Sequence, residues 1–309
     1  MLDLEDPHLL RSILDNLQVG LYVSDREHRI VFWNDGAERI TGYMRHSVIG
    51  HLCSRTEQAG PEKKVCPFCG SDSPEETLRD GTVVDSQIYL QHKAGYMIPV
   101  HARAVPIRDA QRSVAGVLRI FEERQTVAAT SQKNLATHGC LDTLSGVPNH
   151  RFTEFHLRES LLSFAQYHLP FGILCIAIDG IARVQETYGR EATYAMLHMA
   201  AQTASHVLGP SAFLGRWGEN EFIGIVVNCD RAELDKRGAE LQQVASDAHI
   251  TWWDDRISVK ILLTKAMVRP GDSLETLLER AERRFEKGRQ PAEAATQTTV
   301  EAGQEPGEG

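Results

Sequence analysis

The stretch that decides the fold of the second half of the chain is R-W-G-E-N-E-F at 216–222, followed by the apolar run I-G-I-V-V at 223–227. The apolar residues indicate a buried strand, and the run is far too short to span a bilayer. Together with the residues before it, the stretch predicts a hairpin of two strands, 212–217 and 221–228.

Strand and helix patterns alternate around this hairpin, which predicts an α/β domain with helices covering a sheet. The domain is expected to span 142–290. The tail at 291–309 is rich in Ala, Thr, Glu, Gly and Gln and lacks aromatics, so we expect it to be disordered. The other predicted elements are helix 151–166, strand 171–179, helix 190–207, helix 231–247, strand 257–266 and helix 273–287.

Two strings in this half resemble the GGDEF domain of diguanylate cyclases, the enzymes that join two GTP molecules into cyclic di-GMP. The string D-T-L-S-G-V-P-N-H-R at 142–151 is similar to the family's D-x-L-T-G-L-P-N-R-R, and G-E-N-E-F at 218–222 resembles Gly-Gly-Asp/Glu-Glu-Phe. The resemblance implies a nucleotidyl cyclase-type fold with a hairpin turn at the second string. The degenerate motif positions are Gly218, Glu219, Asn220, Glu221 and Phe222.

The resemblance also implies where a cyclase would hold Mg²⁺, and both positions have lost their acid. One ligand of the family is the first Asp of an Asp-x-Asp-x-Phe-Lys segment, which aligns with Ala177. The other is the third residue of the turn, here Asn220. Mg²⁺ selects oxygen ligands, preferably charged ones, so a methyl group and a neutral amide are poor replacements. Glu219 replaces a glycine that lets the backbone approach phosphates, and its carboxylate would repel them.

The two positions that contact guanine in the family have changed as well. They carry Gln185 and Tyr194, which leaves these residues and Gly218 as weak nucleotide-binding positions. We therefore expect a domain that keeps its fold, lacks catalytic activity, and acts by binding other signalling proteins, a second copy in a homodimer, GTP or cyclic di-GMP. The alternative is an active diguanylate cyclase whose Mg²⁺ is held by rewired ligands from among Asp179, Glu219 and Glu221.

The first half has a different order of elements. Two strands at 20–25 and 29–34 and a helix at 35–41 precede three strands. This order resembles a PAS domain, as do I-V-F-W-N-D-G-A-E-R-I-T-G-Y at 30–43 and the strings around 95–109. The resemblance implies an α+β sensor, an antiparallel sheet with flanking helices, over 1–123. The polar stretch that follows, with its scattered apolar positions, is expected to form a helical linker at 124–141. The three later strands are predicted at 83–92, 97–107 and 114–121.

Cysteines cluster in this first half. C-P-F-C stands at 66–69, and Cys53 lies thirteen positions before Cys66, with His51 close to it. Thiolate and imidazole ligands suit a zinc or iron centre, and a Cys-Pro-x-Cys pair also suits a redox disulfide. The third interpretation of His51, Cys53, Cys66 and Cys69 is a set of ordinary loop residues. His92 is interpreted as a satisfied or exposed histidine.

Composition limits the remaining function classes. The net charge of −9 argues against a nucleic-acid partner, which requires a basic face. The acidic start of the chain does not resemble a signal peptide, and no apolar run is long enough for a membrane anchor. Six cysteines in 309 residues do not suggest a disulfide scaffold. We expect a cytoplasmic signalling protein.

Overall fold

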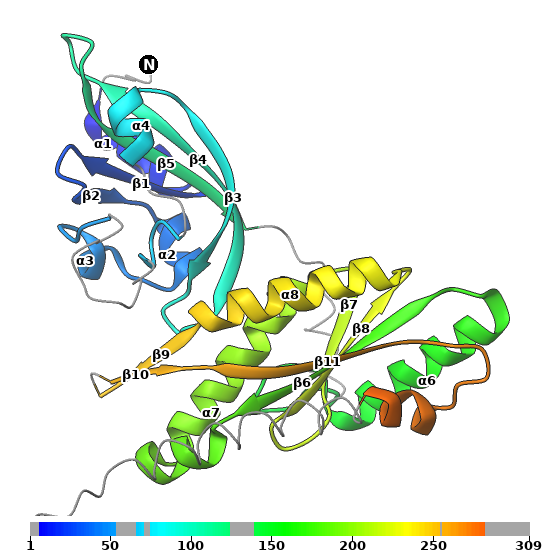
Figure 1. Ribbon diagram of the computed structural model, residues 1–309. Coiled ribbons are helices and arrows are strands. Elements are labelled where there is room, and N and C mark those ends of the chain that lie inside the picture. Colours follow the sequence, from blue (N-terminus) through cyan, green and yellow to red (C-terminus); the bar gives the residue numbers. More distant parts are fainter. Residues whose placement is uncertain (1–5, 54–65, 71–74, 124–138, 254, 282–309) are drawn as a thin grey trace, which may run out of the picture.

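The computed structural model describes two domains, an N-terminal and a C-terminal one, arranged as in Figure 1. The predictions of a helical linker and a disordered tail fall mainly on 124–138 and 282–309, which lie outside the described residues. The structure describes residues 6–53, 66–70, 75–123, 139–253 and 255–281.

The N-terminal domain is built on a five-stranded antiparallel sheet with the strand order β2-β1-β5-β4-β3. Helix α2 begins at the buried Asn34, whose side chain accepts hydrogen bonds from the backbone N–H groups of Leu21 and Ala37 and so ties the helix to β1. The predicted antiparallel sheet with flanking helices is confirmed. Its elements are α1 (Pro7–Asp15), β1 (Gly20–Asp25), β2 (Ile30–Trp33), α2 (Asp35–Thr41), α3 (Arg45–Val48), α4 (Glu75–Asp80), β3 (Val84–Gln91), β4 (Met97–Arg108) and β5 (Val114–Glu123).

The C-terminal domain has a four-stranded antiparallel sheet with the order β11-β6-β8-β7 and a separate hairpin of β9 and β10. The hairpin of β7 and β8 lies where the apolar run predicts it. The elements are α6 (His150–Tyr167), β6 (Phe171–Asp179), α7 (Ile181–Leu208), β7 (Ala212–Arg216), β8 (Glu221–Val227), α8 (Arg231–Asp247), β9 (His249–Trp252), β10 (Asp255–Ser258) and β11 (Lys260–Met267), and further helical residues occupy 274–281.

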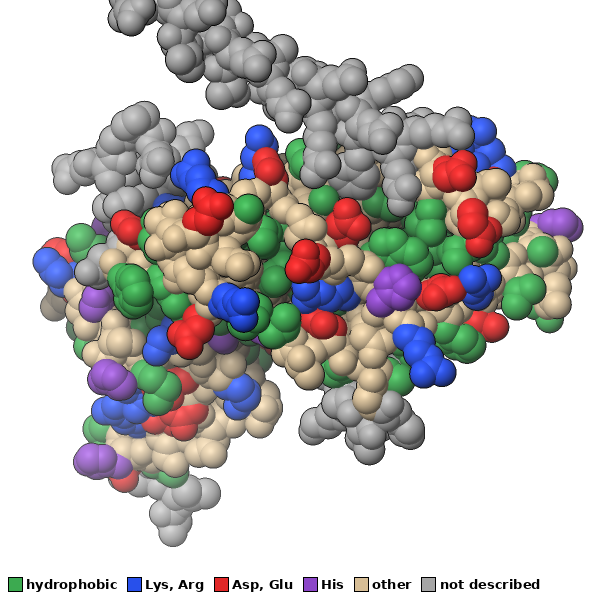
Figure 2. Space-filling model, turned by 90° about the horizontal axis from the view of Figure 1, so that it is seen from below, with side chains coloured by type: hydrophobic (Ala, Val, Ile, Leu, Met, Phe, Trp, Pro, Cys, Tyr) green, Lys and Arg blue, Asp and Glu red, His purple; other side chains and the backbone are tan. Residues whose placement is uncertain are grey.

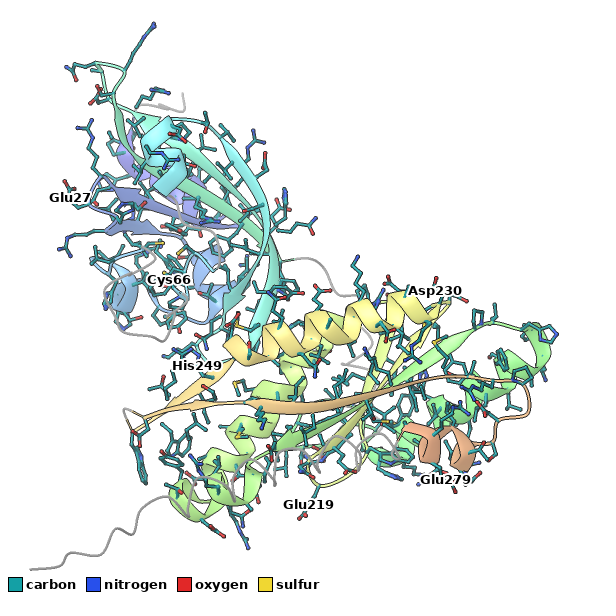
Figure 3. The ribbon with its side chains drawn as sticks, viewed as in Figure 1. Glu27, Cys66, Glu219, Asp230, His249 and Glu279 are labelled. Atoms are coloured by element: carbon teal, nitrogen blue, oxygen red, sulfur yellow. The ribbon has the colours of Figure 1, made fainter. Side chains whose placement is uncertain are left out.

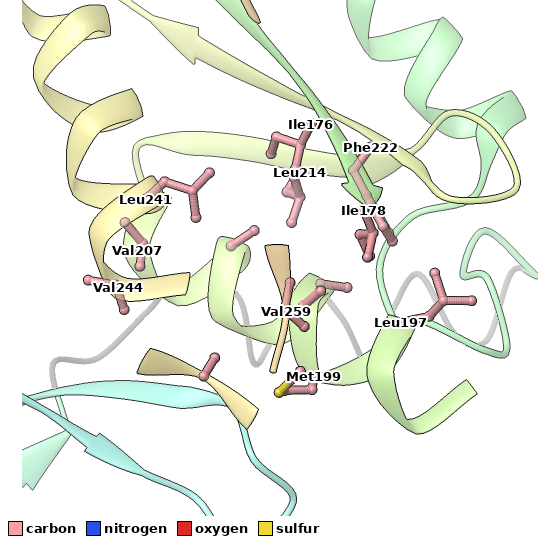
Figure 4. Packing of buried hydrophobic residues seen from close by; sticks show 14 of the residues in the cluster. Ile176, Ile178, Leu197, Met199, Val207, Leu214, Phe222, Leu241, Val244 and Val259 are labelled. Atoms are coloured by element: carbon pink, nitrogen blue, oxygen red, sulfur yellow. The ribbon is translucent and has the colours of Figure 1, made fainter. Parts of the chain in front are cut away.

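The central strand β6 is buried on both faces, because successive side chains of a strand point in opposite directions. Leu174, Ile176 and Ile178 pack with α7 and α8, whereas Ile173 and Cys175 pack on the side of α6. Figure 4 shows Ile176, Ile178 and Phe222 meeting residues of the two helices in the first of these layers. These two core layers hold β6 and β8 side by side, which places the turn between β7 and β8 at the end of β6.

The predicted helix 190–207 is confirmed as the second segment of α7. Gly189, with the non-helical angles φ 84° and ψ −178°, separates it from an earlier segment that begins at Ile181 and was not predicted. The predicted strand 257–266 is two strands, and β9 was not predicted. Trp253 lies in the turn from β9 to β10 with φ 47° and 81% of its surface exposed.

Among the described residues, no helix combines the length and the apolar composition that a membrane span requires. The face drawn in Figure 2 carries acidic and basic side chains side by side, without a large area of one sign.

Candidate functional site

The turn that joins β7 to β8 is held by backbone hydrogen bonds and by one arginine. The N–H groups of Trp217 and Gly218 donate to the Glu221 carbonyl at 2.8 and 3.1 Å. The Arg216 guanidinium donates to the Gly218 carbonyl at 3.0 Å and also to the Glu219 carbonyl. Arg216 therefore has a structural role, because it satisfies carbonyl groups that the tight turn leaves without strand partners.

Arg216 also fastens the turn to the loop before α6. Its Nη1 lies 2.8 Å from Asp142 Oδ1, and the same oxygen accepts hydrogen bonds from the backbone and hydroxyl of Ser145. Burial alone would raise the pKa of Asp142, but the hydrogen bonds from Ser145 and Arg216 outweigh it and lower that pKa. The two strings that resemble the GGDEF family thus meet in one hydrogen-bonded unit.

The two positions predicted to have lost metal ligands lie next to each other in space. Ala177 on β6 pairs with Glu221 on β8, and the preceding Asn220 reaches across to β6. The Asn220 Nδ2 donates to the Ile178 carbonyl at 2.9 Å, and the backbone carbonyl of Asn220 accepts from the Ile178 N–H at 2.9 Å. Ala177 offers only a buried methyl group, and the Asn220 amide is engaged with the backbone. These residues do not fit a Mg²⁺ ion, which requires charged oxygen ligands.

The carboxylates named as alternative ligands are directed elsewhere. Asp179 lies 3.6 Å from Lys260, its partner on β11, on the side of β6 away from the turn. Glu219 is exposed, at the end of the domain that is far from the N-terminal one (Figure 3). The Glu221 side chain lies against Gly218: a Cβ atom added to Gly218 would be 2.8 Å from Glu221 Oε2. Within the described ranges, these carboxylates form no three-residue group of converging metal ligands.

The predicted nucleotide positions do not line the groove at the start of α7. Gln185 and Tyr194 are both exposed on α7. A groove of about 470 Å³ beside the start of α7 is lined by Asp179, Arg183 and Lys260, among others, but by none of residues 218–222. Gln185, Tyr194 and the turn therefore do not share this groove.

A second constellation lies in the core of the N-terminal domain (Figure 3, at Cys66). The sulfur atoms of Cys53, Cys66 and Cys69 all lie within 4.8 Å of one another, and all three residues are buried. We call these three residues the cysteine cluster. His51, which the sequence placed with them, is exposed and does not belong to this group. The Tyr22 hydroxyl lies 3.0 Å from the Cys53 sulfur.

The cysteine cluster favours one negative charge and resists a second. Hydrogen bonds from Cys53 and Cys69 lower the pKa of Cys66 to about 3. The hydrogen bond to Cys66 raises the pKa of Cys53, and the hydrogen bond to Cys53 raises that of Cys69. The physical cause is shared: neighbouring thiols stabilise the first thiolate, whose charge then opposes further ionisation.

A third set of residues, which the sequence analysis missed, joins the two domains. The hairpin of β3 and β4 packs against α7 and β9, and its Met97 belongs to the core of the C-terminal domain. Tyr89 donates to Glu240 on α8 at 2.7 Å, and the Gln91 side chain donates to the His249 carbonyl at 3.0 Å. Figure 3 shows His249 where the domains meet. We call this contact the domain junction.

Four histidines lie at the domain junction: His249 and three others that surround Tyr96. His92 stacks on Tyr96 with ring centres 4.3 Å apart, and Tyr96 also contacts His198 and His206 on α7. Burial, followed by the charges of His206 and His198, lowers the pKa of His92 to about 4. Burial also lowers the pKa values of His198 and His206. The sequence offered one sign of this contact, a glycine at position 95. In the structure Gly95 has φ 92°, and a side chain there would collide with the His249 carbonyl.

Comparison with known families agrees with both halves of this description. Residues 18–124 match a PAS domain model, and residues 140–293 match the model described as "Diguanylate cyclase, GGDEF domain". The chain therefore belongs to the proteins that join a PAS domain to a GGDEF domain, as the sequence predicted.

Individual relatives are distant. The chain is 20% identical over 249 residues to the probable diguanylate cyclase DgcE of Escherichia coli K12, a match that covers 80% of this chain but 22% of that protein. Diguanylate cyclase SiaD of Pseudomonas aeruginosa, solved with its activator SiaC, is 19% identical with a TM-score of 0.49, covering 53% of this chain and 64% of SiaD. The GGDEF domain of DgcB from Caulobacter crescentus, solved with c-di-GMP, is 16% identical with a TM-score of 0.48, covering 50% and 89%.

Proposed function

We propose that this protein is a signalling protein in which the PAS domain controls a catalytically inactive GGDEF domain, and that the GGDEF domain acts by binding a protein. The observation that carries the proposal is the pair Ala177 and Asn220. One has no ligand atom, and the other donates its amide to the Ile178 carbonyl. A cyclase needs divalent metal to stabilise the charge that develops on the transferred phosphate, and this pair offers no charged oxygen.

The retained residues of the motif support the same function. Arg216 binds three oxygen atoms of the surrounding loops, and Phe222 is 2% exposed in the core. Both residues have structural roles that do not require a nucleotide. Exposed side chains at Gln185 and Tyr194 do not restore guanine recognition, so a second copy of the chain or another signalling protein is the favoured partner over GTP or cyclic di-GMP.

The domain junction provides the route by which the PAS domain acts. The hairpin of β3 and β4 contributes Met97 to the GGDEF core and two side-chain hydrogen bonds to α8 and β9. A shift of this hairpin would therefore change the packing of the helices that cover the GGDEF sheet.

The test is cyclic di-GMP formation by the purified full chain with GTP and Mg²⁺ or Mn²⁺, measured by chromatography. We expect no product. Product formation that is lost in Glu219→Gln or Glu221→Gln would overturn the proposal and establish a cyclase with rewired ligands.

A restored variant, Ala177→Asp with Glu219→Gly and Asn220→Asp, shows whether the missing ligands alone silence the domain. Its matched control carries Asp179→Asn in addition, because Asp179 is directed toward Lys260 and should not contribute. Partner binding is tested on the unaltered chain by its oligomeric state, measured by sedimentation, and by calorimetry with GTP and with cyclic di-GMP. Nucleotide binding without turnover would replace the protein partner with a nucleotide.

A further inference from the structure

We propose that Cys53, Cys66 and Cys69 bind one thiophilic metal ion of the zinc class in the core of the PAS domain. The cysteine cluster brings three buried sulfur atoms within 4.8 Å of one another from two separate segments of the chain. Thiolates are the ligands that zinc prefers in sites of this kind. The proposal does not depend on whether the GGDEF domain is catalytic.

The distances between sulfur atoms fit a tetrahedral ion. Zinc–sulfur bonds of about 2.3 Å at tetrahedral angles place two ligand sulfurs about 3.8 Å apart. The sulfurs of Cys53 and Cys66 are 4.0 Å apart. A disulfide would use only two of the three thiols and leave the third buried beside it. The convergence of all three sulfurs therefore favours a metal over a disulfide.

The turn that carries two of the ligands is closed by backbone hydrogen bonds. The Gly70 N–H donates to the Cys66 carbonyl at 2.9 Å, and the Cys69 N–H donates to the same carbonyl at 3.4 Å. Gly70 has φ 61°, and an added Cβ would lie 2.4 Å from the Tyr89 carbonyl, so the turn packs closely on β3.

Two buried polar residues complete the surroundings. The Tyr22 hydroxyl lies 3.0 Å from the Cys53 sulfur and can donate to it, which makes Tyr22 a positioning residue. Arg119 is 1% exposed and pairs with Tyr22 across β1 and β5. Three thiolates around a divalent cation leave one net negative charge, and a buried guanidinium in the same core offsets it. A tetrahedral ion then has one further position for water or a small ligand.

The cysteine cluster is also connected to the domain junction through β3. Gly70 contacts the backbone of β3 at Tyr89, and the Tyr89 hydroxyl reaches Glu240 on α8 of the GGDEF domain. A metal that fixes the Cys66–Gly70 turn therefore restrains the strand that contacts α8. Hydrogen exchange in α8 and β3 should slow when the metal binds.

The test uses the full chain, freed of metal by a chelator and kept reduced, and titrated with Co²⁺ and then Zn²⁺. We expect one Co²⁺ per chain with sulfur-to-cobalt charge-transfer absorption that Zn²⁺ abolishes. Cys66→Ser should lose this absorption, whereas Cys175→Ala, which removes a buried cysteine of the GGDEF domain, should keep it. Tyr22→Phe keeps all three sulfurs and should weaken binding by about 10–100-fold.

Two results would overturn the proposal. One is a chain that is folded by circular dichroism, has all six cysteines reduced, and shows no charge-transfer absorption with Co²⁺. The other is a protein purified without reductant that has two titratable thiols fewer than the sequence provides, with the loss mapped to the cysteine cluster. That result would identify a redox disulfide.

Discussion

The turn between β7 and β8 and the cysteine cluster differ in which part of a site each has kept. At the turn, the backbone hydrogen bonds, the Arg216 contacts and the buried Phe222 are all present, but Ala177 and Asn220 supply no charge. In the cysteine cluster, three reactive side chains converge within the core of a sensor domain. The residues of a motif can therefore have purely structural roles, as they do in the hairpin of β7 and β8. Folding alone does not explain why three thiols converge in the cysteine cluster.

The largest expected effect concerns the structural role of the turn. Phe222→Ala removes a side chain that is 2% exposed, and should cost about 3–5 kcal/mol of unfolding free energy in the GGDEF domain. Urea denaturation measures the loss. Phe155→Ala is the matched control, since Phe155 is 56% exposed, and should cost far less. Equal losses in the two variants would contradict a structural role for the motif.

Zinc should distinguish the two regions directly. Because a ligand that binds only the folded state stabilises it, Zn²⁺ at about 100 times its dissociation constant should stabilise the PAS domain by about 2.7 kcal/mol. The GGDEF turn should gain nothing from Mg²⁺. Hydrogen exchange resolved by domain measures both effects. Protection of β6 and β8 by Mg²⁺ would mean that the turn holds a metal after all.

A single substitution at the turn should show how Asn220 is used. Asn220→Asp replaces the amide that donates to the Ile178 carbonyl with a carboxylate that cannot donate, and should cost about 1–3 kcal/mol. Asn228→Asp, at an exposed position, is the control for the added charge. Thermal unfolding compares the two variants. If Asn220→Asp stabilised the protein in Mg²⁺, the site would be closer to a working cyclase than its geometry indicates.

The smallest effect concerns the domain junction that lies between the two regions. The pKa of His92 is lowered to about 4, and those of His198 and His206 are also lowered, so the folded junction favours neutral rings. A depressed histidine pKa gives stability that is complete above pH of about 6.5 and is lost as the pH falls toward 4. We expect the domains to separate in that window, as measured by small-angle X-ray scattering. His92→Phe keeps the stacked ring and should reduce the pH dependence.

The features that the sequence predicted correctly depend on residues close together in the chain. The apolar run after the turn predicted β8, and the Cys-x-x-Cys spacing predicted the pair Cys66 and Cys69. The sequence could not show that Cys53 joins them while His51 faces solvent, because that depends on how separate segments pack. It predicted His92 only as a satisfied or exposed histidine, since the neighbouring histidines on α7 are distant in the chain. The helix predicted from 190 does follow a break at Gly189, but the helical segment before that break was not predicted.

The measurement that tests the central claim most directly is calorimetric titration of the unaltered full chain with GTP, with and without Mg²⁺. We predict no Mg²⁺-dependent binding, because Ala177 and Asn220 offer the metal no charged oxygen. Binding that requires Mg²⁺ and disappears in Glu221→Gln would contradict it, and would show that the turn has kept its chemistry as well as its fold.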